Sequence, residues 1–269
     1  MLKYIFNYQY LNIVKKPNKM KSFIPFILLL VIPSFIFAQN KTYLGFDIGR
    51  KYDIYQSIDN GDALYTEPFT CCPVLGINLG QEINKTFTFE TGIYLNSYGG
   101  GFGINGIGYT GGNNFLAYQI PLRLKANLNI IEDKLRLVTT VGYTFAYNLN
   151  PGSTGSGSII STSTSQSSGV MIDSSIVEYN YNVSQREYYG LLETGISIEY
   201  IFKNDIIIYL AANYLTGFKR MVEYDVKYTL NNQGEQNGKA FSNGDYYSIF
   251  LGLRYPISNI WNKKDKLDN

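Results

Sequence analysis

Eight segments of alternating apolar and polar residues recur along this chain, separated by gaps that run long, short, long, short, long, short, long. A period of two is typical of a β-strand whose two faces differ, and a tilted strand needs about 9–11 residues to cross a bilayer. Membrane barrels turn tightly on the periplasmic side, carry long loops outside and have an even number of strands. We therefore predict an all-β fold, an eight-stranded antiparallel up-and-down transmembrane β-barrel of the smallest outer-membrane size. The predicted strands are 42–55, 74–83, 86–98, 116–128, 135–147, 188–202, 205–218 and 246–257.

The polar face of these segments indicates which side meets lipid. A soluble barrel of lipocalin type points its apolar residues inward, whereas a membrane barrel points them outward. Glycine weakens a water-exposed strand but fits a narrow lumen crowded by long side chains. The polar face carries Gly45, Gly49, Gly76, Gly80, Gly92, Gly142, Gly195 and Gly252. This favours the membrane barrel, with a soluble periplasmic ligand-binding barrel as the lesser alternative.

Charged residues of both signs also lie on the polar face. Groups buried in a lumen must be paired unless they lose their charge, and here acids and bases balance. The predicted lumenal charge network consists of Asp47, Glu90, Arg123, Lys125, Arg136, Glu193, Glu199 and Arg254. It is a structural prediction, because such pairs are more often structural than catalytic.

Tyrosines and prolines carry two further expectations. Tyrosines near the strand ends are expected to form the interfacial aromatic girdles of a membrane barrel; they are Tyr43, Tyr98, Tyr118, Tyr147, Tyr200, Tyr214, Tyr247 and Tyr255. Pro121 and Pro256 each remove a ladder donor inside a predicted strand, so we expect a bulge or a local kink there.

The N-terminal segment has the layout of a secretory signal peptide. A basic start at Lys21 precedes an apolar run and a small-residue end at Ala38, so we predict cleavage after Ala38. The predicted organisation is a signal peptide at 1–38, in which 1–19 is either an upstream extension or a long basic n-region, a barrel at 39–257 and a short polar periplasmic tail at 258–269. Without the leader the chain has 18 basic and 21 acidic residues, which gives no argument for nucleic acid.

The chain has two cysteines, and they are adjacent in the first long gap. Free thiols would be unusual in an exported protein, yet a bond between neighbours closes a small strained ring. A vicinal disulfide of Cys71 and Cys72, and free or partner-paired thiols, both stay open.

The long gaps are the places where partner binding is expected. The Ser/Thr/Gly tract 151–169 has little to bury and is expected to be mobile. Segments 176–183 and 222–228 alternate again and are expected to pair as a sheet above the membrane. The stretch 99–103 is expected to be a flexible loop whose Phe102 contacts a partner. Loops 148–187 and 219–245 are the predicted sites for an extracellular or envelope protein partner.

One strand segment carries a family resemblance. The stretch Tyr118-Gln119-Ile120-Pro121-Leu122-Arg123-Leu124-Lys125 resembles the aromatic-x-Ile-Pro-Leu-x-x-Lys strand of the PorT-like outer-membrane β-barrel family of Bacteroidota. The segment Gly252-Leu253-Arg254-Tyr255 is similar to that family's closing strand. The resemblance spans about 41–257 and implies an outer-membrane barrel; some relatives are implicated in protein secretion.

The composition argues against several chemistries. The chain has no histidine, the residue that most often serves as a general acid or base. The acids Asp59, Asp62 and Glu67 match no calcium-loop spacing, and the glycine-rich stretch 99–103 is followed by no phosphate-binding helix. Eight strands leave an interior just wide enough for side chains.

We predict a non-enzymatic barrel without a cofactor, in the outer-membrane lipid of a Gram-negative bacterium. It acts structurally, through its loops, or as an accessory of an envelope machine; a narrow passive pore is the alternative.

Overall fold

The computed structural model describes residues 41–68, 72–105, 108–132, 134–149, 154–164, 171–230 and 234–257. The predicted signal peptide and the polar tail lie outside these residues. The described strands belong to one compact unit that begins at Lys41. Among the described residues, no helix is both long and apolar enough to cross a membrane.

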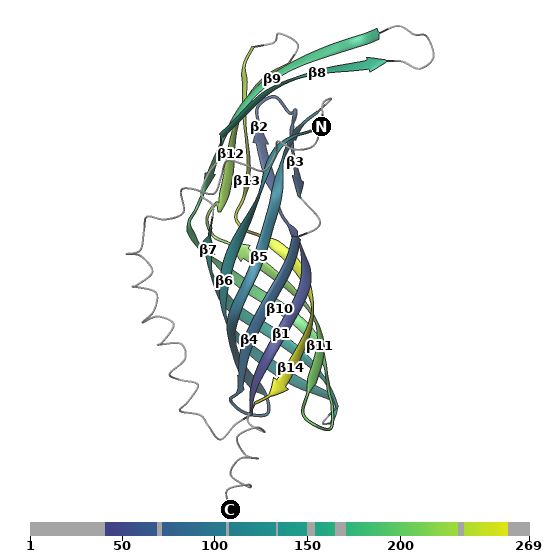
Figure 1. Cartoon of the computed structure of the whole chain (residues 1–269), viewed down its shortest axis with the longest axis vertical. Helices are drawn as coiled ribbons and strands as arrows, with labels where there is room; N and C mark the ends of the chain where they lie inside the picture. The colour runs from purple at the N-terminus through teal and green to yellow at the C-terminus, as the bar shows by residue number, and fades with distance from the viewer. Residues whose placement is uncertain are drawn as a thin grey trace, which may run out of the picture. The chain divides into compact units, whose positions relative to one another are not determined.

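Eight antiparallel strands close into a barrel (Figure 1). The strand order is β5-β4-β1-β14-β11-β10-β7-β6, and β5 pairs with β6 to close the sheet. The strands are β1 (Thr42–Asp53), β4 (Cys72–Glu82), β5 (Phe87–Ile104), β6 (Gly108–Ile131), β7 (Leu135–Asn148), β10 (Tyr188–Ile201), β11 (Ile207–Gly217) and β14 (Tyr246–Pro256). The predicted up-and-down barrel of eight strands is therefore confirmed.

The two faces of the barrel have the polarity of a membrane barrel. In β1, Leu44, Phe46 and Ile48 are about half exposed on the outside, while Asp47 between them is buried inside. Strand β14 repeats this pattern over its whole length, because every second residue is exposed. Its outward residues are Tyr247, Ile249, Leu251, Leu253 and Tyr255. A soluble barrel would have the opposite arrangement, so the alternative of a soluble ligand-binding barrel is wrong.

The prediction of which tyrosines form the aromatic girdles is only partly confirmed. Tyr118, Tyr200, Tyr247 and Tyr255 are exposed on the outer surface by 45–56%, as a girdle requires. Tyr43 and Tyr98, in contrast, are buried inside the barrel. They have the same strand parity as the lumenal residues, and parity, not nearness to a strand end, decides the side.

Pro121 fits into β6 without a bulge. The ladder between β5 and β6 has one register from Phe87↔Ala126 to Phe102↔Gly111, with no pairing recorded between Thr91↔Leu122 and Tyr94↔Gln119. The register shifts of β6 lie elsewhere. The Thr91 hydroxyl donates a hydrogen bond to the Pro121 carbonyl at 2.8 Å. Of the expected bulge or local kink, the bulge is therefore wrong for Pro121; a short gap in the β5–β6 ladder lies there instead. Pro256 is the last residue of β14 and pairs with Tyr43.

The glycine-rich stretch 99–103 is part of a strand, not a flexible loop. Strands β5 and β6 continue past the barrel as one long hairpin, and β3 (Leu64–Pro68) pairs with the extended part of β5. Phe102 is fully buried, so the expected exposure to a partner is wrong. A Cβ on Gly101 would lie 2.0 Å from the Gly111 carbonyl oxygen, which shows how closely the two backbones approach.

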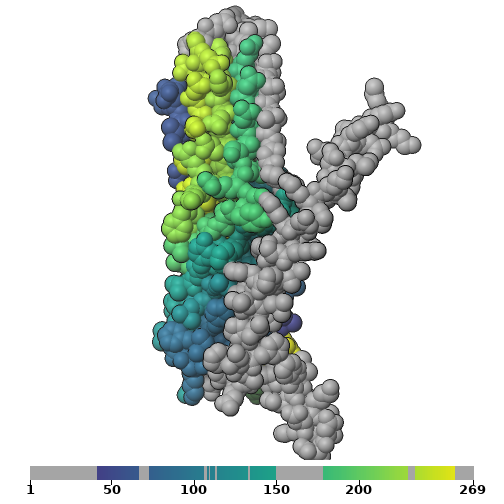
Figure 2. All heavy atoms as spheres, turned by 90° about the vertical axis from the view of Figure 1, so that its left-hand side faces the viewer, coloured from purple at the N-terminus to yellow at the C-terminus, as the bar shows by residue number. Residues whose placement is uncertain are grey.

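A second antiparallel sheet forms from the other long gaps, in the order β2-β13-β12-β9-β8. Figure 2 shows β12 and β13 (yellow-green) side by side with β9 (green). The strands are β2 (Gln56–Asp59), β8 (Thr154–Thr164), β9 (Met171–Gln185), β12 (Val222–Leu230) and β13 (Gln236–Ser242). The predicted pairing of 176–183 with 222–228 is confirmed. The tract 151–169, expected to be mobile, instead contributes β8, because its backbone pairs with β9.

This second sheet packs against the extended hairpin through one apolar cluster. Tyr224, Tyr228 and Val226 of β12 are buried in the same cluster as Phe102 and Ile104 of β5. The Tyr224 hydroxyl donates a hydrogen bond to the Gly100 carbonyl at 3.0 Å. Membrane barrels carry their long connections on the outer side. We therefore call this two-sheet region, formed by β2, β3, β8, β9, β12, β13 and the extended ends of β5 and β6, the extracellular sandwich.

Candidate functional site

Asp47 lies in a cross-strand row in which large residues alternate with glycine. The register aligns Asp47 with Gly76 on one side and Gly252 on the other. The next strands place Tyr94 beside Gly76 and Tyr209 beside Gly252. Both phenol hydroxyls donate hydrogen bonds to the Asp47 carboxylate across these glycines. A Cβ at Gly76 or Gly252 would lie 2.3 or 2.1 Å from the tyrosine ring, so the glycines supply the space that this contact requires.

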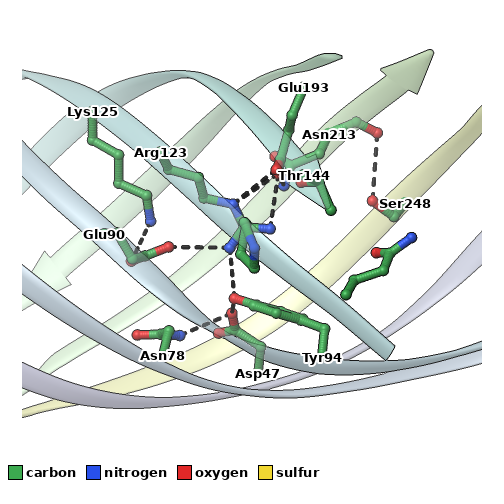
Figure 3. A network of polar contacts seen from close by, with 12 residues as sticks. Asp47, Asn78, Glu90, Tyr94, Arg123, Lys125, Thr144, Glu193, Asn213 and Ser248 are labelled. Atoms are coloured by element: carbon green, nitrogen blue, oxygen red, sulfur yellow. Dashed lines mark hydrogen bonds and ion pairs between the residues drawn. The ribbon is translucent and has the colours of Figure 1, made fainter. Parts of the chain in front are cut away.

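Arg123 crosses the lumen in the same way (Figure 3). It pairs with Glu90 on β5, at 3.1 Å between Nη1 and Oε1. On the other side it reaches past Gly142, which separates it from Glu193 in the register, and its Nη2 lies 2.8 Å from Glu193 Oε1. Arg123 Nη1 also donates to the Tyr94 hydroxyl at 2.6 Å. The guanidinium of Arg123 therefore connects its own strand, β6, to β5 and to β10.

Glu90 connects this group to a second set of ion pairs. It is fully buried and lies 2.6 Å from Lys125 Nζ and 3.0 Å from Arg254 Nη2. Arg254 Nη1 in turn lies 2.6 Å from Glu199, and Arg136 Nε lies 2.6 Å from the other oxygen of Glu199. Buried charges are tolerated when they are paired in this way.

Seven of the eight predicted network residues are thus joined by ion pairs. Asp47 is the exception, because its contacts are hydrogen bonds from Tyr94, Tyr209 and Asn78, the last at 3.0 Å. The predictions did not single out these three donors. The signal was present, since Tyr94 and Asn78 lie at polar-face positions of their strands, but pattern alone does not show that their hydroxyl and amide groups converge on one carboxylate.

A separate polar layer fills the extracellular end of the lumen. Lys51 Nζ lies 2.5 Å from Asp53 and 3.2 Å from the centre of the Tyr98 ring, with the Tyr246 ring at 4.7 Å. Gln119 donates to the Tyr98 hydroxyl at 2.7 Å and accepts from the Tyr246 hydroxyl at 2.9 Å. Lys51 and Asp53 were also not predicted as lumenal residues. Both lie an even number of positions after Asp47 in β1, so the alternation of the strand already placed them on the lumenal face.

The lumen is filled by these side chains. Beside the Asp47 and Arg123 network lies a cavity of about 10 Å³, which has room for about one water molecule. Its lining residues are Asp47, Arg123, Lys125, Thr140, Ser197, Tyr209, Ala211, Asn213 and Phe250. A space of this size accommodates no substrate or cofactor.

Asp59 is the main polar anchor of the extracellular sandwich. Its carboxylate accepts hydrogen bonds from the amides of Ala63 and Leu64 at 2.7 Å and from Gly61 at 3.2 Å. The Tyr228 hydroxyl, from β12, lies 2.7 and 2.9 Å from its two oxygens. Partial burial acts to raise the pKa of Asp59, but these donors outweigh it and hold the pKa below its usual value. Asp59 therefore joins the β2–β3 turn to the second sheet.

We expect this contact to be lost in acid. The folded-state pKa of Asp59 is lowered, so its stabilising contribution is present above the unfolded-state value near 3.8 and disappears as the pH falls through the folded-state pKa. Asp59→Asn should speed hydrogen exchange at the amides of 61–64 about tenfold at pH 7, since it removes a charged acceptor. The matched control is Asp62→Asn, which neutralises a neighbouring exposed acid. Equal exchange rates in both variants would contradict the anchoring role.

The surface of β12 and β13 carries a cluster of charges. Glu223 lies 2.7 Å from Arg220 and 2.6 Å from Lys239, and Asp225 lies 2.9 Å from Lys239. Exposed pairs of this kind contribute little to stability. The cluster therefore keeps this face of the extracellular sandwich polar.

The structure does not assign a site to two features of the sequence, the adjacent cysteines and the acids of the first long gap. Cys71 and the side chain of Cys72 lie outside the described residues, so the disulfide stays a prediction. Among the described residues, no three of the His, Cys, Asp and Glu side chains group as metal ligands would. Asp59, considered for calcium above, instead uses its oxygens on the β2–β3 turn and Tyr228.

No protein-family model matches the chain, and no curated protein matches it. Among solved structures, it is similar to the outer membrane protein OprG from Pseudomonas aeruginosa, at 8% identity and a TM-score of 0.46 over 81% of this chain and 96% of that one. It is similar to Ail, the attachment invasion locus protein of Yersinia pestis, at 8% identity and a TM-score of 0.36 over 80% and 99%. It is also similar to the outer membrane protease OmpT from Escherichia coli, at 11% identity and a TM-score of 0.40 over 82% and 97%.

These similarities carry no argument about function, so the class of this protein follows from its own geometry. A closed antiparallel barrel of eight strands, apolar outside and filled with paired polar groups inside, is a transmembrane β-barrel of the outer-membrane type.

Proposed function

We propose that this chain is a non-enzymatic barrel of the outer membrane of a Gram-negative bacterium, with a closed lumen and a binding function carried by the extracellular sandwich. The observation that carries the proposal is the contrast between the two ends of the fold. The lumen is occupied by its own ion pairs, whereas the long gaps build an additional five-stranded sheet. The partner is either an extracellular molecule or a component of an envelope machine.

The state of the lumenal carboxylates supports a non-enzymatic role. A general base needs a carboxylate within reach of a substrate proton. Glu90 is fully buried and contacts three cations, while Glu193 accepts from Arg123, Thr144 and Asn213. Both carboxylates are committed to the protein's own donors.

Fractionation tests the proposed location. The mature protein is expected in the outer-membrane fraction, and its migration in detergent gels should change on heating, because the closed barrel resists detergent until it is boiled. Recovery as a soluble periplasmic monomer would contradict the proposal.

Planar-bilayer recording separates the closed barrel from the narrow passive pore. We expect no conductance steps from the refolded protein, because the lumenal cavity holds about one water molecule. A general porin in the same bilayers serves as the positive control. Reproducible steps from purified, heat-modifiable protein would support the pore.

A further inference from the structure

Strand β8 is an open edge of the extracellular sheet. It pairs with β9 on one side, from Thr154↔Asn182 to Thr164↔Met171. Among the described residues, no strand pairs with its other side, where the sheet order ends. Such an edge presents a row of backbone donors and acceptors that can pair with another chain.

The sequence of β8 has none of the usual protection of an edge strand. Natural edge strands are commonly blocked by Lys, by Pro or by inward-pointing charges. The eleven residues of β8 read TGSGSIISTST, without a charge or a proline. Charged residues of β12 and β13 lie on other strands of the same sheet, so their absence from β8 is local.

The end of the β8–β9 ribbon is also unsupported on its second side. Over the described part of the chain, β12 pairs with β9 along 177–185. Residues 171 and 173–176 of β9 pair with β8 and have no second described partner. A two-stranded ribbon is marginally stable in water, and a further strand on β8 would turn it into a three-stranded sheet.

The order of residues in β8 indicates what the additional strand is. The middle of the strand is symmetric, because Ser158-Ile159-Ile160-Ser161 reads the same in both directions, and small uncharged residues flank it on both sides, Thr-Gly-Ser-Gly before it and Thr-Ser-Thr after it. An antiparallel pairing of this strand with its own copy about that centre sets Ile159 opposite Ile160 and Ser158 opposite Ser161. Symmetric dimers use this kind of self-complementary contact. An uncharged edge also offers no charge complementarity to a charged partner.

We propose that β8 pairs antiparallel with β8 of a second copy of this chain, joining two extracellular sheets into one. The inference rests on the proposed function, which places the binding role in the extracellular sandwich, and it adds a second copy of the chain to the partners that this region binds. The pairing register is 158 opposite 161 on both sides of the two-fold axis, so each dimer contains this contact twice.

A comparison of two double variants tests this register. S158K/S161K places Lys opposite Lys twice in the dimer, whereas S158K/S161E places Lys opposite Glu twice. Within one chain, the backbone register pairs residue 158 with Glu178 and residue 161 with Ser175. Both variants carry S158K, so the effect of this change within the monomer is the same in each, and only the sign of the charge at position 161 differs.

Sedimentation of the refolded, heat-modifiable protein in mild detergent measures the outcome. We expect the wild type and S158K/S161E to form dimers. The dissociation constant of S158K/S161K should be about tenfold higher than that of S158K/S161E, since cross-strand pairs of like and unlike charge differ by about this much when two act together.

A wild type that stays monomeric at all concentrations would overturn the inference, and so would equal dissociation constants for the two variants. Either result would leave the proposed closed barrel intact, because fractionation and bilayer recording do not depend on β8. Loss of heat-modifiability or the appearance of conductance, in contrast, would count against the proposed function alone.

Discussion

Replacing Glu90 by Gln is expected to destabilise the barrel by about 3–5 kcal/mol, the usual cost of removing one partner from a buried ion pair. Glu90 is fully buried and contacts Lys125, Arg123 and Arg254. The amide keeps the shape of the side chain but removes the charge, so three buried cations share the carboxylates of Glu193 and Glu199. Lys125 is affected most, because Glu90 is the carboxylate that it contacts at 2.6 Å.

Denaturant unfolding of the refolded protein, followed by circular dichroism, measures this loss. The control is Glu235→Gln, which breaks the ion pair with Lys227 on the extracellular surface, where both side chains are about 60% exposed. That change is expected to cost less than about 1 kcal/mol. Adding Lys125→Met to Glu90→Gln should recover part of the stability, because it restores the charge balance of the lumen.

A small effect of Glu90→Gln would have a functional meaning. If the loss were below about 1 kcal/mol, either Lys125 would have lost its proton or the three cations would be solvated by water in the lumen. In the second case the barrel would be wetter than its cavity of about 10 Å³ suggests, and conductance steps in the bilayer recording would then support the narrow-pore alternative.

Leu251→Arg is expected to destabilise the inserted barrel by about 2–4 kcal/mol, the cost of a lipid-facing Arg near the bilayer midplane. Leu251 is the middle residue of β14, lies beside Leu210 and Ile48 and is 55% exposed on the outer surface. The reason is the transfer of a guanidinium from water into hydrocarbon. Unfolding from lipid vesicles measures the loss.

Ile58→Arg provides the matched control. Ile58 is also 55% exposed but belongs to β2 of the extracellular sheet, where water surrounds the outer surface. Its neighbour across the strands is Lys239. The expected cost is therefore the repulsion between two like charges, about 1 kcal/mol at most. Equal costs at both positions would contradict the assignment of the barrel's outer face to lipid.

The barrel itself was predictable because its signal is local. A strand shows two faces in consecutive residues, and the apolar face of the segment beginning at Leu116 is visible without knowledge of any other strand. The pairing of 176–183 with 222–228 followed from the same pattern and appears as the β9–β12 ladder. The balance of charge on the polar face likewise needed only residue types and parity.

Two segments were wrongly predicted as loops from their composition, because pairing of their backbones with other strands decided their structure. The stretch 99–103 and the tract 151–169 resemble loops, because glycine and serine bury little and favour turns. In the fold, 99–103 and the described part of the tract, 154–164, are strands, since the extended hairpin and β9 provide partners for their backbone donors and acceptors. Close approach at Gly101 shows that glycine serves there to bring two backbones together.

The sequence by itself determined the number of barrel strands, which face meets lipid and most of the charged residues of the lumen, because these follow from period-two alternation within each strand. Only the tertiary structure decided the partners. Arg123 reaches Glu193 across Gly142, and Tyr94 and Tyr209 reach Asp47 across Gly76 and Gly252. These contacts depend on the register between strands and on closure of the barrel, which bring together residues up to 162 positions apart.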